Sequence, residues 1–129
     1  MDAKRLEEVG LFAMLSRAEL EKIGRWIDEL DVAAGKELTR EGAIAHEFFV
    51  IEDGEASVSQ DGEEIATLGR GDFFGEIALL ESPRRTATVV AATPMRLLVM
   101  HGRDFKAMER EVPLVADRLR AAIYARLSS

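Results

Sequence analysis

The feature that most restricts how this chain can fold is a series of short, strand-like segments separated by glycine turns. Between residues 31 and 100, apolar and polar residues alternate in segments of about four to eight residues, the length expected for β-strands. The turn signals are Asp53-Gly54, Asp61-Gly62 and Arg70-Gly71. Asp-Gly pairs indicate tight turns because glycine tolerates a positive φ. Many short strands at this spacing predict an antiparallel barrel or jelly roll rather than a parallel sheet.

Helical segments are predicted before the strand region. Residues 1–30 are expected to be helical, with a short helix before Ser16 and a longer one after it. Ser16 and Glu19 have the form of a capping box, in which each side chain accepts a hydrogen bond from a backbone N–H of the first turn. Trp26 is interpreted as packing the second helix against the rest of the domain. Apolar residues recur mostly three to five positions apart, at Leu15, Leu20, Ile23, Ile27 and Leu30.

Two further helices are predicted after the strand region, over residues 103–129. Pro113 suits the first position of the second of these helices, because the missing N–H would have no helical partner there. Four apolar residues at intervals of four share one face of it: Val115, Leu119, Ile123 and Leu127. The whole chain, residues 1–129, is therefore predicted to be one domain. It is mainly β, an antiparallel, jelly-roll-like β-roll over residues 31–100 with flanking helices.

Composition narrows the functions that such a domain can have. The formal net charge of −7 disfavours nucleic acid and anionic lipid as partners, so any anion must be held by a local cluster of donors. The chain has no cysteine, and its two histidines, His46 and His101, lie far apart in sequence, which disfavours a metal site. No apolar run approaches the roughly 18 residues of a membrane span, and the N-terminus lacks the apolar core of a secretory signal. We therefore expect a cytoplasmic protein that is not an enzyme.

One stretch, GEIALLESPRRTATVV at residues 75–90, interrupts the alternating pattern with a short predicted helix. Gly75 has no side chain, so a ligand can approach the backbone there, and the N–H groups of the following turn form an anion site. Arg85 can add a forked guanidinium, and Thr86 a hydroxyl, at the same place. Glu76 only accepts hydrogen bonds and therefore needs a hydroxyl or amine donor. An anion beside a hydroxyl donor describes a sugar phosphate.

The same stretch resembles a known family. Residues 74–89, FGEIALLESPRRTATV, closely resemble the phosphate-binding cassette of cyclic nucleotide-binding domains, which reads F-G-E-[ILM]-A-L, four variable positions, then R-[STA]-A-[TS]-V. LFAMLSRAELEKI is similar to the N-terminal helices of that family, LTREGAIAHEFFVIEDGEASV to its strands, and LGRGDFFGE to its L-x-x-G-[DE]-x-F-G-E pattern. The resemblance covers nearly the whole chain and implies a β-roll with a short phosphate-cassette helix.

The resemblance implies a role for most cassette residues. Arg85 would neutralise the cyclic phosphate, and Glu76 would accept a hydrogen bond from the ribose 2′-hydroxyl. The Thr86 hydroxyl would assist at the phosphate. The backbone N–H groups that complete the cradle would be those of Gly75, Ile77 and Ala78.

The assignment of the phosphate arginine has an alternative. The family often has proline directly before this arginine, whereas here Pro83 is followed by Arg84. Counted from Pro83 the ligand would be Arg84, but counted from Gly75 and from the following Thr-Ala-Thr-Val it is Arg85. Only one of two adjacent strand residues can face inwards, and the two matching intervals favour Arg85.

Residues outside the phosphate contact are candidates for the surroundings of the base. From the roll these are Phe49, Ile77, Thr88 and Val89, and Ala87 is a further candidate for ligand binding. From the last helix they are Arg120, Ile123 and Tyr124, which are candidates for capping the base. An apolar stripe on a terminal helix is more often core or dimer packing, so the capping role competes with that simpler interpretation.

These observations predict a regulatory module that binds cAMP or cGMP and relays binding through movement of its C-terminal helices. Its expected partners are the nucleotide and a protein effector or fused effector domain, with a homodimer as a further expectation. Neither a cofactor beyond the nucleotide nor a metal, nucleic acid or membrane is expected. The alternative is a degenerate β-roll that has lost its ligand and acts as a protein-protein interaction or dimerisation module. The sequence does not choose between cAMP and cGMP.

Overall fold

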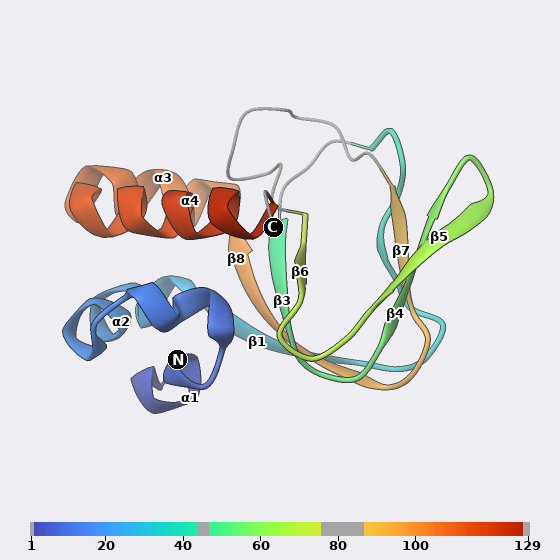
Figure 1. Cartoon of the computed structure of the whole chain (residues 1–129), viewed down its shortest axis with the longest axis horizontal. Coiled ribbons are helices and arrows are strands. Elements are labelled where there is room, and N and C mark those ends of the chain that lie inside the picture. Colours follow the sequence, from blue (N-terminus) through green and yellow to red (C-terminus); the bar gives the residue numbers. More distant parts are fainter. Residues whose placement is uncertain (1, 44–46, 76–86, 128–129) are drawn as a thin grey trace.

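The computed structural model describes residues 2–43, 47–75 and 87–127 of the chain, and it has helices on one side of a β-roll (Figure 1). The N-terminal helices are α1 (Ala3–Glu7), the 3-10 helix η1 (Gly10–Met14), α2 (Arg17–Ile23) and the 3-10 helix η2 (Gly24–Trp26). The strands are β1 (Asp28–Val32), β2 (Glu37–Thr39), β3 (Glu47–Asp53), β4 (Ala56–Gln60), β5 (Glu63–Leu68), β6 (Phe73–Phe74), β7 (Thr88–Ala91) and β8 (Met95–His101). The C-terminal helices are α3 (Gly102–Glu111) and α4 (Pro113–Leu127).

The strands of the described residues form two four-stranded sheets, in the orders β1-β8-β3-β6 and β2-β7-β4-β5. Every strand pairing within them is antiparallel. The predicted fold class, an antiparallel β-roll with flanking helices, is therefore confirmed. At the hairpin between β4 and β5, Asp61 and Gly62 have φ values of 52° and 81°. Two successive residues at positive φ are what the Asp-Gly signal predicted.

The first sheet separates two hydrophobic cores. On β3, Phe48 and Val50 pack with the helices, whereas Phe49 and Ile51 face the interior of the roll. β8 is divided in the same way, which is why its residues from Leu97 to Met100 are all buried. The second sheet has the roll interior on one face only, and β4 and β7 accordingly alternate between buried and partly exposed residues.

The N-terminal helices confirm the predicted capping box, but the predicted C-terminal boundary of the helical region is wrong. The capping box is present: Ser16 N donates to Glu19 Oε1 at 2.9 Å, and Glu19 N donates to Ser16 Oγ at 3.2 Å. The helical region does not reach residue 30, however, because β1 begins at Asp28 and pairs with β8. Trp26 packs on the helical core as predicted, and the Arg25 guanidinium lies 4.0 Å above its ring.

The C-terminal helices match the predicted face. Pro113 is the first residue of α4, and Val115, Leu119 and Ile123 are buried in the helical core. α3 begins at Gly102, directly after β8. Ion pairs of 2.9 Å join these helices to the N-terminal ones, Arg25 to Glu111 and Arg118 to Glu19. In the described part of the chain, no helix is both long and apolar enough to cross a bilayer.

Candidate functional site

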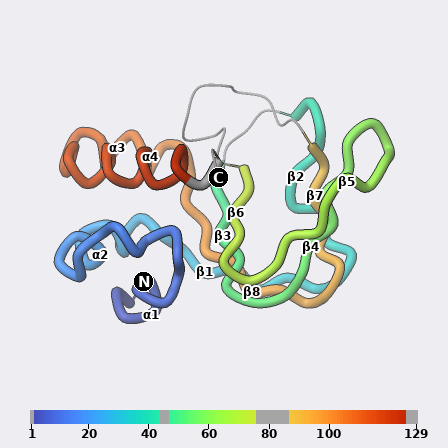
Figure 2. Tube along the Cα trace, viewed as in Figure 1, coloured from blue at the N-terminus to red at the C-terminus, as the bar shows by residue number. Residues whose placement is uncertain are grey.

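The predicted cassette joins the two sheets of the roll. β6, at the edge of the helix-side sheet, ends at Phe74, and β7, in the other sheet, begins at Thr88 (Figure 2). Residues 76–86 lie outside the described residues. The ligand roles assigned there therefore stay predictions, namely those of Glu76, Ile77, Ala78, Arg84, Arg85 and Thr86. The structure does describe how both ends of the segment are held.

The N-terminal end of the cassette is fixed to the roll through an aromatic pair. Phe74 is paired with Phe49 in the ladder, and their rings stack with centroids 4.8 Å apart and planes 16° apart. The next residue, Gly75, has a φ of 75°. This is the left-handed region, which costs about 1–2 kcal/mol for a residue with a Cβ. Glycine at this position is thus required by the backbone itself, in addition to the ligand access predicted from the sequence.

The C-terminal end of the cassette is fixed by two hydrogen bonds from the segment that contains β2. Thr39 Oγ1 donates to the carbonyl oxygen of Ala87 at 3.1 Å, and the backbone N–H of Glu41 donates to Thr88 Oγ1 at 3.0 Å. Thr39 is only 6% exposed and is the one polar residue buried in the described part of the chain. Sequence reasoning missed Thr39, because its partner lies 48 positions away and no local pattern connects them.

The predicted floor of the site is packed protein core. Phe49 and Val89 are 2% and 4% exposed and belong to the cluster that fills the roll. Ala87 and Thr88 are half-buried, and Ala87 packs against the same cluster. Phe49 on β3 and Val89 on β7 thus reach the roll interior from different sheets, whereas Thr88 is not part of that core.

The three candidates for capping the base lie in different surroundings on α4. Arg120 donates to Glu109 Oε2 at 2.6 Å and to Asp117 Oδ1 at 3.0 Å, and its guanidinium lies 5.2 Å above the Phe105 ring. Ile123 is fully buried in the helical core, whereas Tyr124 is 46% exposed. Arg120 and Ile123 are thus committed to contacts within the helices, and the capping assignment stays a prediction.

A charged network fixes α1 to the helix-side sheet. Arg5 binds Glu29 of β1 at 2.7 Å and also Glu52 of β3, and Arg96 of β8 binds Glu29 at 3.0 Å and Asp31 at 3.0 Å. The hydrogen bond from Arg5 lowers the pKa of the Glu29 carboxyl, and the hydrogen bond to Asp31 raises the pKa of the Arg96 guanidinium. These charges hold the N-terminal helix in place on the sheet.

Comparison with known sequences shows the family of the chain. Residues 29–111, more than half of the chain, match the cyclic nucleotide-binding domain family. The protein therefore belongs to the cyclic nucleotide-binding domain family, as the cassette resemblance predicted. The residues matched begin in β1 and end at the last residue of α3.

Relatives with different effectors share this domain. The cAMP-dependent protein kinase regulatory subunit of Schizosaccharomyces pombe is 35% identical over 118 residues, which are 90% of this chain and 29% of that protein. A cyclic nucleotide-gated potassium channel of Rhizobium etli is 36% identical over 112 residues, 87% of this chain and 31% of the channel. The chain thus spans less than a third of the length of these relatives.

Solved structures agree on the fold. The N-terminal domain of a transcriptional regulator from Streptomyces coelicolor superposes with a TM-score of 0.79 at 29% identity, covering 96% of this chain and 92% of that one. The structure of cAMP-bound PfPKA-R gives a TM-score of 0.75 at 26% identity, covering 92% of this chain and 45% of that one.

Proposed function

We propose that this domain is a regulatory sensor that binds cAMP or cGMP in the cassette between Gly75 and Val89 and reports the binding to a protein effector or a fused effector domain. In the proposed site Arg85 neutralises the cyclic phosphate, Glu76 accepts from the ribose 2′-hydroxyl, and the backbone N–H groups of Gly75, Ile77 and Ala78 complete the cradle. Relatives named as regulatory subunits support a regulatory rather than a catalytic role.

The observation that carries the proposal is the way in which the cassette is anchored. Gly75 leaves β6 at positive φ directly after the stacked Phe49–Phe74 pair, and Ala87 is held by the buried Thr39. In general, a connecting segment with fixed ends loses less conformational entropy when a ligand binds to it than one with free ends. Together with the family match and the motif, this favours a ligand cradle over a plain connection between strands.

The test is isothermal titration calorimetry with cAMP and with cGMP. Arg85→Ala is expected to weaken binding by about 2–5 kcal/mol, because it removes one partner of a desolvated charge pair. This corresponds to a loss of roughly thirtyfold to several thousandfold in affinity. Arg84→Ala is the matched control and should change affinity by less than about threefold. The reverse result would transfer the phosphate contact to Arg84, and unchanged affinity in both variants would remove the proposed site.

The relay to the C-terminal helices is a second part of the proposal. α3 begins directly after the last residue of β8, and Phe105 and Met108 of α3 belong to the same core as Leu98 of β8. A ligand can shift such an arrangement only by its difference in affinity for two helix positions.

Trp26, the single tryptophan, can report on this relay. Arg25 covers its ring and is ion-paired with Glu111 at the end of α3. We expect saturating nucleotide to change Trp26 fluorescence in the native chain, and the change to be absent in Arg85→Ala at the same concentration. A fluorescence change that persists in a variant without measurable binding would contradict the relay.

The alternative is that the roll binds no nucleotide and serves as a dimerisation module. Exposed apolar residues on α4 favour it, since Leu114 is 74% and Tyr124 is 46% exposed. A ligand that binds only the native state must raise the apparent stability. A thermal-shift screen without response to either nucleotide, combined with a dimer in sedimentation, would support the alternative.

A further inference from the structure

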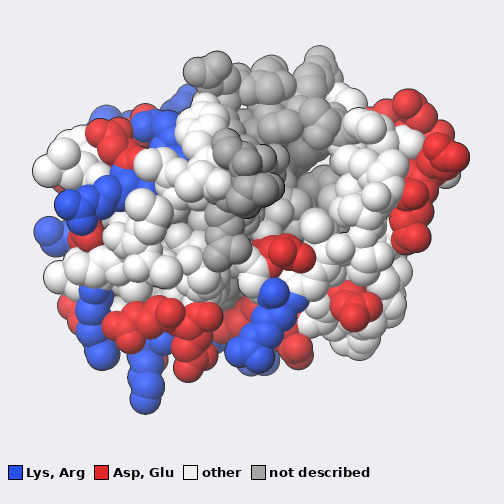
Figure 3. All heavy atoms as spheres, in the orientation of Figure 1, with Lys and Arg blue, Asp and Glu red and all other residues white. Residues whose placement is uncertain are grey.

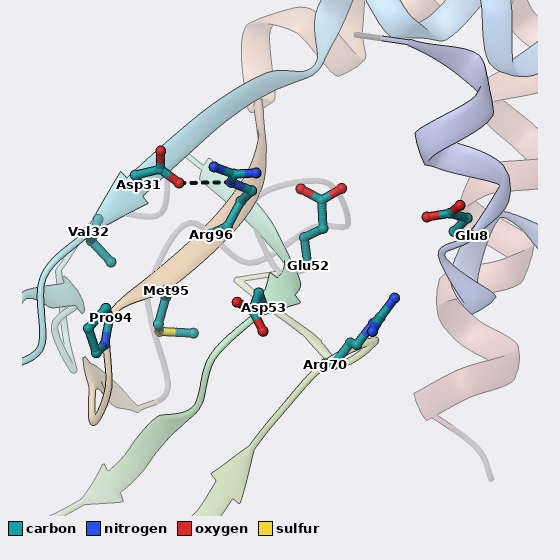
Figure 4. A pocket seen from close by; sticks show the side chains of 9 residues that line it. All are labelled: Glu8, Asp31, Val32, Glu52, Asp53, Arg70, Pro94, Met95 and Arg96. Atoms are coloured by element: carbon teal, nitrogen blue, oxygen red, sulfur yellow. Dashed lines mark hydrogen bonds and ion pairs between the residues drawn. The ribbon is translucent and has the colours of Figure 1, made fainter.

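A groove of about 650 Å³ lies on the surface between α1, the end of β3 and the start of β8 (Figure 4). Its volume falls in the range of ligand sites, about 300–1,000 Å³. The floor is formed by Val32, Pro94 and Met95, and the walls by charged side chains, most of which are exposed. None of the described cassette residues, which are residues 74–75 and 87–89, is among those that line this groove.

Part of the charge along the groove is already paired. Arg96 is bound to Asp31 and Glu29, and Glu52 accepts from Arg5. These pairs join three strands and α1, so they hold the walls of the groove in position.

Three other charged groups on the walls have no hydrogen bond or ion pair with the described residues, namely Glu8, Asp53 and Arg70. In Figure 4, Glu8 extends towards the groove from α1, and Asp53 lies at the end of β3 with Met95 on one side and Arg70 on the other.

The loop that carries Arg70 is tied down by hydrogen bonds. Gly71 N donates to the Ile51 carbonyl at 2.9 Å, Ile51 N donates to the Asp72 carbonyl at 2.8 Å, and Gly69 N donates to Asp72 Oδ2 at 2.8 Å. The guanidinium of Arg70 is therefore presented from a fixed backbone position.

The unpaired groups define the chemistry of a ligand. The unpaired groups are two carboxylates and one guanidinium, an excess of negative charge that favours a ligand with a positive charge. Within the described residues no group of acidic side chains converges closely enough to hold a metal ion, which favours an organic cation here. Arg70 in turn requires an acceptor. A polyamine supplies no acceptor, whereas a peptide supplies both a cationic side chain and backbone carbonyls.

We propose that this groove binds a lysine- or arginine-bearing peptide segment of a partner protein. The cationic head binds Asp53 on the side of Met95, away from Arg70, and the aliphatic part of its side chain lies on Met95 and Pro94. Arg70 donates to a peptide carbonyl, and Glu8 adds negative charge at the α1 end of the groove. An open groove suits a chain that enters and leaves it, and long basic side chains commonly cover apolar surface in this way.

The probe is the pentapeptide acetyl-Ala-Arg-Ala-Arg-Ala-amide, titrated into the ¹⁵N-labelled chain at low salt. Its matched control has citrulline in place of both arginines, which keeps the shape and removes the charge. We expect saturable shifts concentrated at the backbone amides of Asp53, Arg70, Gly71, Met95 and Arg96, and none with the citrulline peptide. Shifts spread equally over the acidic β4–β5 hairpin would show general attraction to an acidic protein and overturn the proposal.

Variants distinguish specific binding of the peptide in the groove from general electrostatic attraction to an acidic surface. Glu8→Gln and Asp53→Asn should each weaken peptide binding by about three- to fivefold, the size of an exposed ion pair. Glu63→Gln removes the same charge from the exposed β4–β5 hairpin, where acidic side chains gather on the surface (Figure 3), and should leave binding unchanged. Equal effects of Glu63→Gln and Asp53→Asn would exclude the groove.

Arg70→Met gives a test of opposite sign. If binding were only attraction between a cation and an acidic surface, removing Arg70 would strengthen it, whereas loss of a donor to the peptide carbonyl weakens it by about threefold. Stronger or unchanged binding would therefore overturn the peptide assignment. None of these titrations contains nucleotide, so failure of the groove leaves the nucleotide proposal untouched, and failure of nucleotide binding leaves the groove testable.

Discussion

The two sheets of the roll differ in how many of their faces are covered by packed side chains. The sheet β1-β8-β3-β6 has helices on one face and the roll interior on the other, so its central strands are buried on both sides. The sheet β2-β7-β4-β5 has the roll interior on one face, and its edge strand β5 has Ile65 55% exposed. The first sheet therefore joins two cores, whereas the second only closes the roll.

Because of this difference, the two ends of the cassette are attached to sheets that are packed differently. Phe74, at its start, belongs to the two-sided sheet, and Ala87, at its end, is tied to the one-sided sheet through Thr39. A displacement at the start of the cassette acts on β3, whose opposite face packs against the helical core. A displacement at the end of the cassette acts on strands that are partly exposed. Transmission to the helices is therefore expected through β3 and β8.

The largest expected effect comes from truncating adjacent aromatic residues on β3. Phe48 and Phe49 are each 2% exposed, one in the helical core and the other in the roll core. Phe48→Ala and Phe49→Ala should each lower the free energy of unfolding by about 3–5 kcal/mol, measured by urea denaturation. At concentrations where both remain folded, Phe49→Ala should weaken nucleotide binding more, because Phe49 stacks on Phe74 beside Gly75. A stronger loss of binding in Phe48→Ala would show that the two faces are not separate.

A smaller effect is expected where the one-sided sheet holds the cassette. Thr39→Val keeps the shape of the side chain but removes the hydrogen bond to Ala87, which should cost about 1–2 kcal/mol in the free energy of unfolding. It should also weaken nucleotide binding several-fold, since one end of the cassette loses its anchor. Thr67→Val, at an exposed position of β5, is the control and should change neither quantity measurably. Equal effects of both substitutions would mean that burial, rather than the anchor, matters.

The strand region could be predicted from local signals because those signals fix local geometry. The Asp61-Gly62 pair produced its two positive φ values, and Pro113 began α4. The unbroken apolar run of β8 is also a local signal that indicates burial on both faces, since a strand covered on both faces needs no alternation of polar and apolar residues. These elements depend on neighbours in the sequence.

The predictions that were wrong or missing concern residues whose conformation is decided by contacts with residues far away in the sequence. Ile27 and Leu30 continue the helical spacing of the N-terminal region, yet β1 begins at Asp28 because its residues pair with β8, about 70 positions later. Thr39 was missed for the same reason. In the candidate site, the motif located the cassette and predicted that a ligand approaches the backbone at Gly75, whereas the positive φ of Gly75 was not predicted. The phosphate and ribose contacts stay predictions.

The smallest expected effect tests whether the helical layer, unlike the one-sided sheet, depends on charge. Glu19 accepts from Ser16 N and from Arg118 of α4 at 2.9 Å, and the bond from Ser16 is the main cause that lowers its pKa. A lowered pKa in the folded chain stabilises it at pH values above the unfolded pKa, and this stability is lost as the pH falls through the folded pKa.

Glu19→Gln should therefore lower the free energy of unfolding at pH 7, by less than about 1 kcal/mol because the pair is partly exposed. At about pH 3 the difference between the two proteins should be smaller than at pH 7, since the contribution of the Glu19 charge is lost as the pH falls through its lowered pKa. Urea denaturation at the two pH values measures the difference, with Glu63→Gln in β5 as the control that should show none. A Glu19→Gln deficit that is the same at both pH values would assign the effect to the shape of the capping box rather than to charge between α2 and α4.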